Sequence, residues 1–433
     1  MKERPTLGSL FDGIGGFPLA GLKAGISPKW AAEIEPFPIR VTTKRLPEMK
    51  HYGDIHALRG DLLEPVDIVT FGSPCQDFSI AGKRSGLEGV RSSLFFEAVR
   101  IIREMGEKTD GSYPQWVVWE NVPGALSSSG GEDFREVLQS LASIKEPGAD
   151  VPMPEDGKWL PAGEIMGDGY SLAWRILDAA KGWGVAQRRR RVFVVLDLGG
   201  QRAGQVLFES EGLSGYTPPP VQKGEGAAGD ASRGAGTASW PGRVIAFEPG
   251  AAKRLGGHAW FEEAGTLRAD MGDNQTAVAI ELPQPSYCLT VGGFGDVSTE
   301  EAPTLMARNF KDPPVIGKPE PPPPNYRVRR LTPVECARLQ GFPDDWCGKL
   351  ETPEPSEQEI QQWVGIFEEW RLAVGKSARP RSRKQIVQWL RDPCTDAAEY
   401  KAYGNSVAVP CVFFVLAGIV WALSTKPDAV TES

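Results

Sequence analysis

The segment with the clearest chemical potential is residues 71–79, which read Phe-Gly-Ser-Pro-Cys-Gln-Asp-Phe-Ser. Cys75 comes shortly after an apolar run, residues 66–71, that has the composition of a buried strand. Open α/β sheets bind ligands beyond the ends of their strands, so a thiol at this position is a candidate nucleophile. A lone cysteine is more often buried and inert. Other motifs in the chain are needed to choose between a nucleophilic and an inert cysteine.

Glu120 and two arginines are the next candidates. Glu120 ends the strand-like segment 116–119, where an isolated carboxylate is about as often a strand-end cap as a catalytic group. Its place one strand from the thiol suits a general acid. Arg189 and Arg191 enter a later strand-like segment, and residues two apart share one face of a strand. Both can point towards Cys75, where a guanidinium favours the thiolate over a thiol of pKa about 8.5.

A glycine turn follows the first strand-like segment, in the order Phe11-Asp12-Gly13-Ile14-Gly15-Gly16. Glycines at a strand-to-helix turn let the backbone approach a ligand closely. Glu33 lies about 20 residues on, at the acidic position that binds ribose hydroxyls in such folds. Asp54 and Ile55 follow a third segment, where a carboxylate can accept from an adenine amino group. Together these residues indicate an adenosine-containing cofactor, without separating NAD from S-adenosylmethionine.

The elements that must position these residues alternate between strand-like and helix-like over residues 1–198, which is typical of a mostly parallel sheet. We predict an α/β fold, with a Rossmann-like, mostly parallel sheet, helices on both faces, and a smaller strand-and-loop domain. The composition of residues 127–168 is rich in Gly, Pro and Ser and predicts a loop. The predicted strands are 6–10, 30–34, 66–71, 116–119, 171–177 and 192–196, and the predicted helices are 17–24 and 92–105.

Four regions are predicted along the chain. Residues 1–198 form a catalytic and cofactor-binding domain, and residues 199–348, rich in Gly and Pro, form the smaller domain. Residues 349–395 form a helical insert, with helices at 357–374 and 383–391 that carry tryptophans on their apolar faces. Residues 396–425 complete the first domain, because the apolar helix 409–423 needs a core in which to be buried.

Composition sets further limits. The chain has 433 residues, 41% of them apolar and 24% charged, which is ordinary for a soluble globular protein. Six cysteines without a CxxC pair argue against a disulfide framework and a zinc site, so we expect no metal and a reducing cytoplasm. We expect neither a signal peptide nor a membrane span.

The net charge of −8 argues weakly against a nucleic-acid partner, but arginines cluster at 188–191, 327–330 and 379–384.

The order of motifs strongly resembles that of the cytosine-C5 DNA methyltransferases of bacteria and phages. The motifs are FxGxGG, PCQ, ENV, QRRRR, RRLTPVECARLQGFP and GNS, and the resemblance covers residues 6–122, 170–197, 327–347 and 400–420. The PCQ and ENV pair combined with the long late run is very specific. Two positions depart from the family's pattern. Ser73 stands where Phe or Pro is common, and Ala186 stands where Pro usually precedes Gln187.

The resemblance implies a role for each matching residue. Cys75 matches the nucleophile, Glu120 the cytosine-binding acid, and Arg189 with Arg191 the arginine pair near the target base. Residues 76–91 look like the family's mobile loop, which closes over DNA, so that Gln76, Ser79, Lys83 and Arg91 are candidate DNA contacts. The implied cofactor contacts are Phe11, Asp12, Gly13, Gly15, Gly16, Glu33, Ile34, Asp54, Ile55, Leu94, Asn405 and Ser406.

The same resemblance implies the activity. It is transfer of a methyl group from S-adenosylmethionine to carbon 5 of a flipped-out cytosine in a specific duplex DNA sequence, through a covalent bond between Cys75 and carbon 6. Residues 199–325 occupy the place of the family's variable target-recognition domain, with Arg254, Arg268 and Arg308 as candidate DNA contacts. The expected partner is double-stranded DNA, beside a cognate restriction endonuclease that acts separately. We expect a cytoplasmic monomer with no membrane partner.

Three alternatives remain open. An RNA cytosine methyltransferase of the same family would need little recognition domain, and the large region 199–325 argues against it. A non-catalytic DNA-binding regulator would have no need for intact Cys75, Glu120 and Arg189. An NAD-dependent oxidoreductase accounts for the glycine turn but leaves Cys75, Glu120 and the arginines unexplained.

Overall fold

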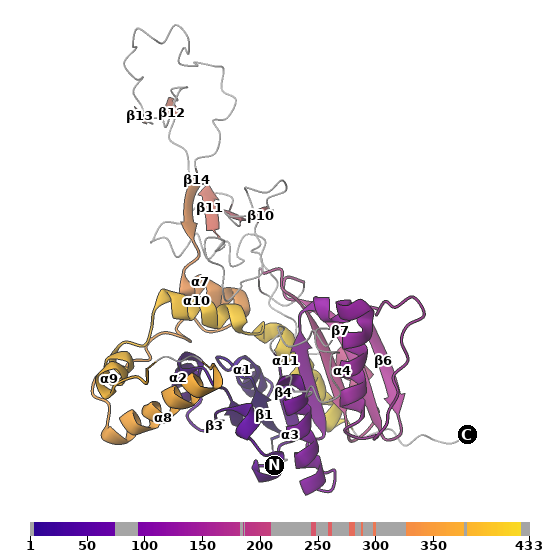
Figure 1. Cartoon of the computed structure of the whole chain (residues 1–433). Helices are drawn as coiled ribbons and strands as arrows, with labels where there is room; N and C mark the ends of the chain where they lie inside the picture. The colour runs from indigo at the N-terminus through magenta and orange to yellow at the C-terminus, as the bar shows by residue number, and fades with distance from the viewer. Residues whose placement is uncertain are drawn as a thin grey trace. The chain divides into compact units, whose positions relative to one another are not determined.

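A computed structural model of the chain divides into two compact units (Figure 1). One unit contains Met1–Val221, Thr266–Asp270 and Thr332–Ser433, and the other contains Gln222–Gly265 and Met271–Leu331. Within these units the structure describes residues 4–73, 94–181, 185, 187–208, 331–375 and 379–425, and the backbone of six strands between residues 244 and 330.

An eight-stranded sheet forms the centre of the first unit, in the order β3-β2-β1-β4-β5-β8-β7-β6. Strands β3 to β5 in this order pair in parallel, whereas β8, β7 and β6 continue the sheet with antiparallel pairs. The Rossmann-like α/β prediction is confirmed, although the sheet is mixed. The strands are β1 Thr6–Leu10, β2 Ser27–Ala32, β3 Lys50–Tyr52, β4 Ile68–Phe71, β5 Trp116–Asn121, β6 Ala162–Gly167, β7 Tyr170–Asp178 and β8 Arg190–Asp197.

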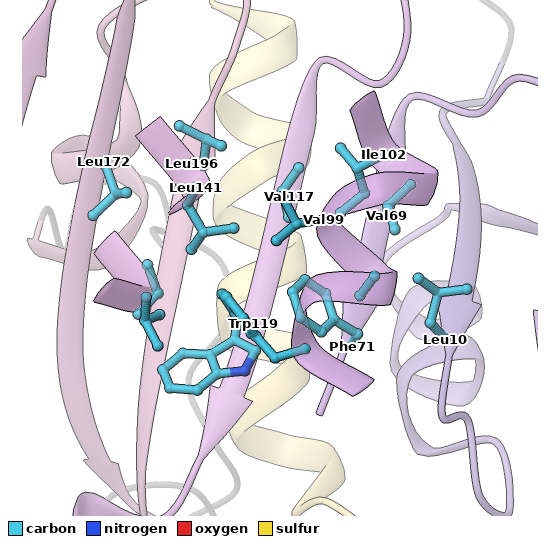
Figure 2. Close-up of a cluster of buried hydrophobic side chains, with 14 of the residues drawn as sticks. Leu10, Val69, Phe71, Val99, Ile102, Val117, Trp119, Leu141, Leu172 and Leu196 are labelled. Carbon is cyan, nitrogen blue, oxygen red and sulfur yellow. The ribbon is translucent and has the colours of Figure 1, made fainter. Parts of the chain in front are cut away.

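Helices cover both faces of this sheet. Helices α3 (Leu94–Lys108) and α4 (Glu132–Ala142) lie on one face, where their leucines, valines and isoleucines meet alternate residues of the strands (Figure 2). Helix α11 (Val409–Ser424) lies on the other face and packs against α1 (Gly16–Lys23) and α5 (Ala203–Phe208). The two faces together bury the sheet, as a largely apolar set of central strands requires.

Helix α11 is strongly apolar along its whole length. The stretch Asp396–Ser424 is the one helical segment in the described part of the chain that is long and apolar enough to cross a membrane. Most of its apolar part is buried inside the first unit. Gly418 lets α11 approach α5 closely, because a Cβ there would lie 3.0 Å from Val206 Cγ1. The prediction that this helix is buried in the first unit's core is confirmed.

The prediction that residues 127–168 form a loop was wrong. This stretch contains α4 and the edge strand β6, which pairs with β7. Phe134, Val137, Leu138 and Leu141 have helical spacing and are buried, but the Gly, Pro and Ser on both sides of them masked that pattern. Helix α2 (Pro36–Arg45) and strand β3 also went unpredicted. Short 3-10 turns occupy Ile55–Ala57, Gly60–Leu62, Pro123–Leu126 and Ser128–Gly131.

The unit boundaries lie at about residues 221 and 331, rather than at the predicted 198 and 348. Helix α5 stays with the first unit because it packs on β7 and α11. Helix α7 (Pro333–Gln340) does so because it packs on α10 (Asp396–Asn405), and its first turn is closed by a capping box between Thr332 and Glu335.

The helical insert belongs to the first unit. Helices α8 (Glu357–Ala373) and α9 (Arg383–Arg391) begin at the N-caps Ser356 and Ser382, within one residue of the predicted ranges. They enclose a small apolar cluster that also includes Ile39 of α2. The insert therefore packs on the helix that follows β2. The other members of the cluster are Ile360, Trp363, Phe367, Ile386 and Leu390.

The second unit contains a four-stranded antiparallel sheet in the order β10-β9-β11-β14, and a two-stranded pair. Its strands are short, which agrees with a small domain of strands and loops. They are β9 Val244–Phe247, β10 Ala259–Phe261, β11 Ala277–Glu281, β12 Tyr287–Cys288, β13 Ser298–Thr299 and β14 Tyr326–Arg330. The candidate DNA contacts Arg254, Arg268 and Arg308 lie outside the described residues.

Candidate active site

The order of strands reverses between β1 and β4, and open α/β sheets bind ligands beside such a reversal, at the carboxyl ends of the strands. The register brings Leu10, Phe71 and Trp119, near the ends of β1, β4 and β5, into one row. The glycine turn, the segment that leads to Cys75, and Glu120 all follow directly from this row. Three motifs that are far apart in the sequence therefore meet at one edge of the sheet.

Glu120 lies directly against the chain that leaves β4. A Cβ built on Gly72 would be 3.2 Å from Glu120 Oε2. The next residue, Ser73, is held by two side chains of β5. Trp119 Nε1 donates to Ser73 Oγ at 3.2 Å, and Asn121 Nδ2 donates to the Ser73 carbonyl at 3.3 Å. The path towards Pro74 and Cys75 thus starts beside Glu120.

Cys75 itself lies outside the described residues, as do the predicted DNA contacts Gln76, Ser79, Lys83 and Arg91. The Ser73 contacts were missed by the sequence interpretation, which recorded this serine only as a departure from the family pattern. Trp119 follows Ser73 by 46 positions, and nothing in the sequence indicates that its indole N–H donates to the Ser73 hydroxyl.

Arg191 is the cationic partner of Glu120. Its Nε atom lies 3.0 Å from Glu120 Oε1, and the Glu120 side chain is about nine-tenths buried. The antiparallel pairing of β8 with β5 sets Glu120 opposite Phe193, which brings the first residues of β8 to the carboxyl end of β5. Burial raises the pKa of Glu120, and the charges of Arg191 and Arg189 oppose that rise.

Arg189 has a different set of contacts from Arg191. It is 3% exposed, and its Nη2 atom donates to the carbonyls of Gly404, at 3.3 Å, and Ser406. Arginine is suited to such multiple bonds because its guanidinium carries five donors in one plane. Arg189 therefore ties the start of β8 to the end of α10, which closes with Gly404 and Asn405, and to Ser406 just beyond it. The prediction that both arginines point alike towards the thiol does not describe these contacts.

The glycine turn after β1 is held by polar contacts and small residues. Ser9 Oγ donates to Asp12 Oδ1 at 2.6 Å, while Asp12 Oδ2 is buried and accepts no hydrogen bond from the described residues. Burial raises the pKa of Asp12 to about 8. Gly13 and Gly15 have φ angles of 59° and 82°, and a Cβ on Gly13 would meet nothing within 4 Å. The backbone of Gly13 is therefore open to a ligand.

Glu33 joins the ends of β1 and β2. Its Oε2 atom accepts from the Gly13 N–H at 2.8 Å, and its Oε1 atom accepts from the N–H groups of Ile34, at 2.7 Å, and Glu35, at 2.8 Å. Burial raises the pKa of Glu33, and these three N–H groups oppose the rise. A carboxylate oxygen has two lone pairs, so Oε2 keeps one for a further donor such as a hydroxyl.

The remaining predicted cofactor residues lie on neighbouring elements. Asp54 caps the turn that begins at Ile55, where its Oδ1 atom accepts from the His56 N–H at 3.0 Å. The Asp54 N–H donates to Glu369 Oε1 at 2.7 Å, a contact from α8 that the sequence interpretation did not predict. Phe11 and Leu94 pack on the core beneath the edge. Gly16, Ile34, Asn405 and Ser406 complete the set, with Gly16 close against Val407 and Ser406.

Comparison with protein families identifies this arrangement. The model of the C-5 cytosine-specific DNA methylase family matches residues 6–145 and 275–363, more than half of the chain. The chain belongs to this family. The solved structure of the S. pombe Dnmt2 methyltransferase resembles it in fold, with a TM-score of 0.51 at 16% identity over 98% of this chain and 100% of that one. The family prediction is thereby confirmed.

Curated relatives of this methylase-family chain are all named as methyltransferases, and one of the names states a target base. One, named DNA N-6-adenine-methyltransferase, from Escherichia phage P1, is 33% identical over 96% of this chain and 61% of its own length. The Type II methyltransferase M.HpaII of Haemophilus parainfluenzae is 24% identical over 95% of this chain and 88% of its own. M2.BsuMI of Bacillus subtilis is 30% identical over 44% of this chain and 41% of its own. The chain thus spans less than two thirds of the length of the first relative, at 61%, and of the third, at 41%.

Proposed function

We propose that the chain is an enzyme that transfers a methyl group from S-adenosylmethionine to carbon 5 of cytosine in duplex DNA. Family membership supports the reaction class. The observation that carries the proposal is the position of Glu120, which is buried between the Arg191 guanidinium and Gly72, three residues before Cys75. The chemistry requires a protonatable carboxyl with a guanidinium beside it, which Glu120 and Arg191 provide, and a thiol, which we assign to Cys75.

The residues at the glycine turn fit S-adenosylmethionine, which carries a sulfonium and an ammonium charge. Asp12 provides a buried carboxyl group and Glu33 a partly buried one, and Asp12 Oδ2 still needs a donor. Glu33 Oε2 retains an acceptor site for a ribose hydroxyl, and the Asp54 carboxylate would accept from the adenine amino group. When bound, the cofactor supplies an electrophilic methyl group.

Cys75 would provide the activation that cytosine lacks. Carbon 5 of the ring is too weak a nucleophile to take a methyl group directly. Addition of the Cys75 thiolate to carbon 6 raises the electron density at carbon 5, and later loss of the carbon-5 proton with expulsion of the thiolate restores the ring. None of these positions is reachable inside a duplex, so the base must be flipped out.

Glu120 would hold ring N3 and the exocyclic amine while the thiolate adds. Burial raises its pKa, so the carboxyl retains a proton more readily near neutral pH and can donate it to N3. Arg191, 3.0 Å from Glu120 Oε1, would stabilise the carboxylate that this donation leaves behind. Arg189 would act through its hydrogen bonds to Gly404 and Ser406, by holding the Asn405 region in place.

The test is covalent trapping on duplex DNA that contains 5-fluorocytosine, in the presence of S-adenosylmethionine. Fluorine at carbon 5 cannot leave as a proton does, so the bond between Cys75 and carbon 6 persists and a denaturation-resistant complex forms. We expect no complex with Cys75→Ser, although that variant should still bind the cofactor. Failure of the wild-type chain to form the complex would exclude Cys75 as the nucleophile.

The target base needs a separate measurement, because the phage P1 relative is named for adenine N6 and because the family alternative acts on RNA. Nucleoside analysis after incubation with duplex DNA or with transfer RNA separates the cases. We expect 5-methylcytosine, in duplex DNA only. N6-methyladenine as the product, which Cys75→Ser would leave unchanged, would replace the cytosine proposal.

We further propose that the second unit recognises the target sequence, with Arg254 and Arg308 as candidate DNA contacts within it and Arg268, in the short segment Thr266–Asp270 that groups with the first unit, as a third. Its size and short antiparallel strands support a domain separate from the chemistry. Bisulfite sequencing of DNA from cells that express the protein would reveal the methylated sequence. Exchange of residues 222–331 with those of a relative should then change the sequence methylated, without changing the modified base.

A further inference from the structure

The insert helix α8 places a carboxylate on the backbone of the adenosine-binding turn. Glu369 Oε1 accepts from the Asp54 N–H at 2.7 Å. A Cβ built on Gly53 would lie 2.0 Å from Glu369 Oε1 and 2.3 Å from its Cδ, distances that real side chains do not adopt. Gly53 has no left-handed φ angle, so a Cβ here would act through space, by displacing the carboxylate end of the Glu369 side chain.

Helix α8 is held rigidly enough to position this carboxylate. Arg40 of α2 is 1% exposed, and its Nη1 atom lies 2.9 Å from Glu359 Oε1 of α8. Its Nε atom donates to the Leu350 carbonyl at 2.8 Å, and its guanidinium carbon lies 5.6 Å from the centre of the Trp363 ring. Breaking this pair would leave the buried Arg40 guanidinium without its carboxylate partner, so α8 and α2 should move together.

The turn that contains Glu33 is also contacted by the segment that follows α8, through an ion pair. Lys401 of α10 lies 2.7 Å from Glu35 Oε1, two residues beyond Glu33. In our proposal the Asp54 turn and the Glu33 turn both bind the adenosine. The segment from α8 through α10 contacts both turns, through Glu369 and Lys401. The family match ends at residue 363, before Glu369.

We infer that the α8–α9 insert is part of the cofactor site, and that Glu369 is a positioning residue that holds the turn of Asp54 and Ile55 against the adenine base. The inference rests on the proposed function, because it assumes that this turn receives the adenosine of S-adenosylmethionine. Glu369 acts through the backbone and not on the reacting atoms. Its loss should therefore weaken cofactor binding and leave methyl transfer at saturating cofactor intact.

The first test is calorimetric titration of the full chain with S-adenosylhomocysteine. We expect Glu369→Ala to bind about tenfold more weakly, from the loss of a charge-assisted hydrogen bond that holds the turn. Glu369→Gln keeps an acceptor and should recover part of the affinity. Glu368→Ala is the matched control, because Glu368 is the neighbouring residue on α8 and pairs with Arg371 instead. It should bind as the wild type does.

The second test uses Gly53. If the glycine exists to admit Glu369, Gly53→Ala should weaken binding in the wild-type chain and have little further effect in Glu369→Ala. Additive effects of the two substitutions would overturn the inference. Wild-type affinity and wild-type KM in both Glu369→Ala and Glu369→Gln would also overturn it. A wild-type chain that does not bind S-adenosylhomocysteine at all would instead refute the proposed function, and the inference with it.

Discussion

Two glutamates at the same edge of the sheet, the partly buried Glu33 and the buried Glu120, differ in their partners. Glu33, at the end of β2, accepts from three backbone N–H groups. Glu120, at the end of β5, faces the cationic side chain of Arg191 and the Gly72 backbone. Burial raises the pKa of both carboxyl groups, but neutral N–H donors oppose the rise in the first and arginine charges oppose it in the second.

The difference indicates how one sheet edge can serve two tasks. Three fixed N–H donors require an acceptor that keeps one position, which suits a group that orients a cofactor. A carboxyl beside a guanidinium can gain and lose a proton while its partner compensates the charge, which suits an acid in a reaction. The same residue type thus has two proposed roles, and the neighbours decide which.

The most direct test of the two proposed roles is to make the same substitution, glutamate to glutamine, at both positions. In Glu120→Gln, the amide cannot give up a proton, so we expect kcat to fall about 100-fold or more while cofactor affinity stays near that of the wild type. Methyl transfer to duplex DNA and titration with S-adenosylhomocysteine measure the two quantities. An active Glu120→Gln enzyme would remove the acid role.

Glu33→Gln should produce the opposite pattern. An amide nitrogen would face a backbone N–H donor, and an unpaired buried donor is costly, so we expect cofactor binding to weaken about tenfold or more. The value of kcat at saturating cofactor and the affinity for DNA should change little. A drop in DNA affinity larger than the drop in cofactor affinity would contradict the cofactor assignment.

Arg191→Met tests the electrostatic part of the comparison. Arg191 lowers the pKa of Glu120, so its removal should raise that pKa further and keep the carboxyl protonated to higher pH. The alkaline fall in kcat should therefore move to higher pH, in addition to any loss of rate. Arg190→Met is the control, since Arg190 is exposed. A shift of the alkaline fall to lower pH would contradict the assignment of that fall to Glu120.

Asp12 offers a smaller test at the glycine turn, because burial raises its pKa from 3.8 to about 8. The folded chain then binds more protons than the unfolded chain between these values, so stability falls as pH rises from about 4 to about 8. Asp12→Asn cannot ionise, and its stability should decline less over that range. Urea denaturation at several pH values measures this, and an unchanged slope would mean that Asp12 is ionised in the fold.

Much of the site could be predicted from sequence because its residues follow strands directly. A strand-like segment that ends in Glu120, or in the glycine turn, must deliver those residues to the end of that strand, whatever surrounds them. Helices α8 and α9 were also predictable, because serine N-caps and regularly spaced tryptophans define them locally. Helix α4 was not, since the Gly- and Pro-rich composition around it outweighed four well-spaced apolar residues.

Contacts between distant segments could not be predicted in the same way. Ser73 meets Trp119, Glu369 meets Gly53, and Arg189 meets Ser406, over separations of 46 to more than 200 residues. No periodicity or spacing encodes such pairs, because each depends on which elements pack together. Arg189 and Arg191 illustrate the limit, since two arginines on one strand-like segment have different partners.

The sequence by itself determined the family, the α/β fold and the types of chemical group near each strand end, because short motifs and hydrophobic periodicity are local properties of a chain. Only the tertiary structure decided which groups touch. The antiparallel return of β8 brings Arg191 to Glu120, and the packing of α8 on α2 brings Glu369 to Gly53. The physical reason is that these contacts depend on strand direction and helix packing, which burial of the whole core selects.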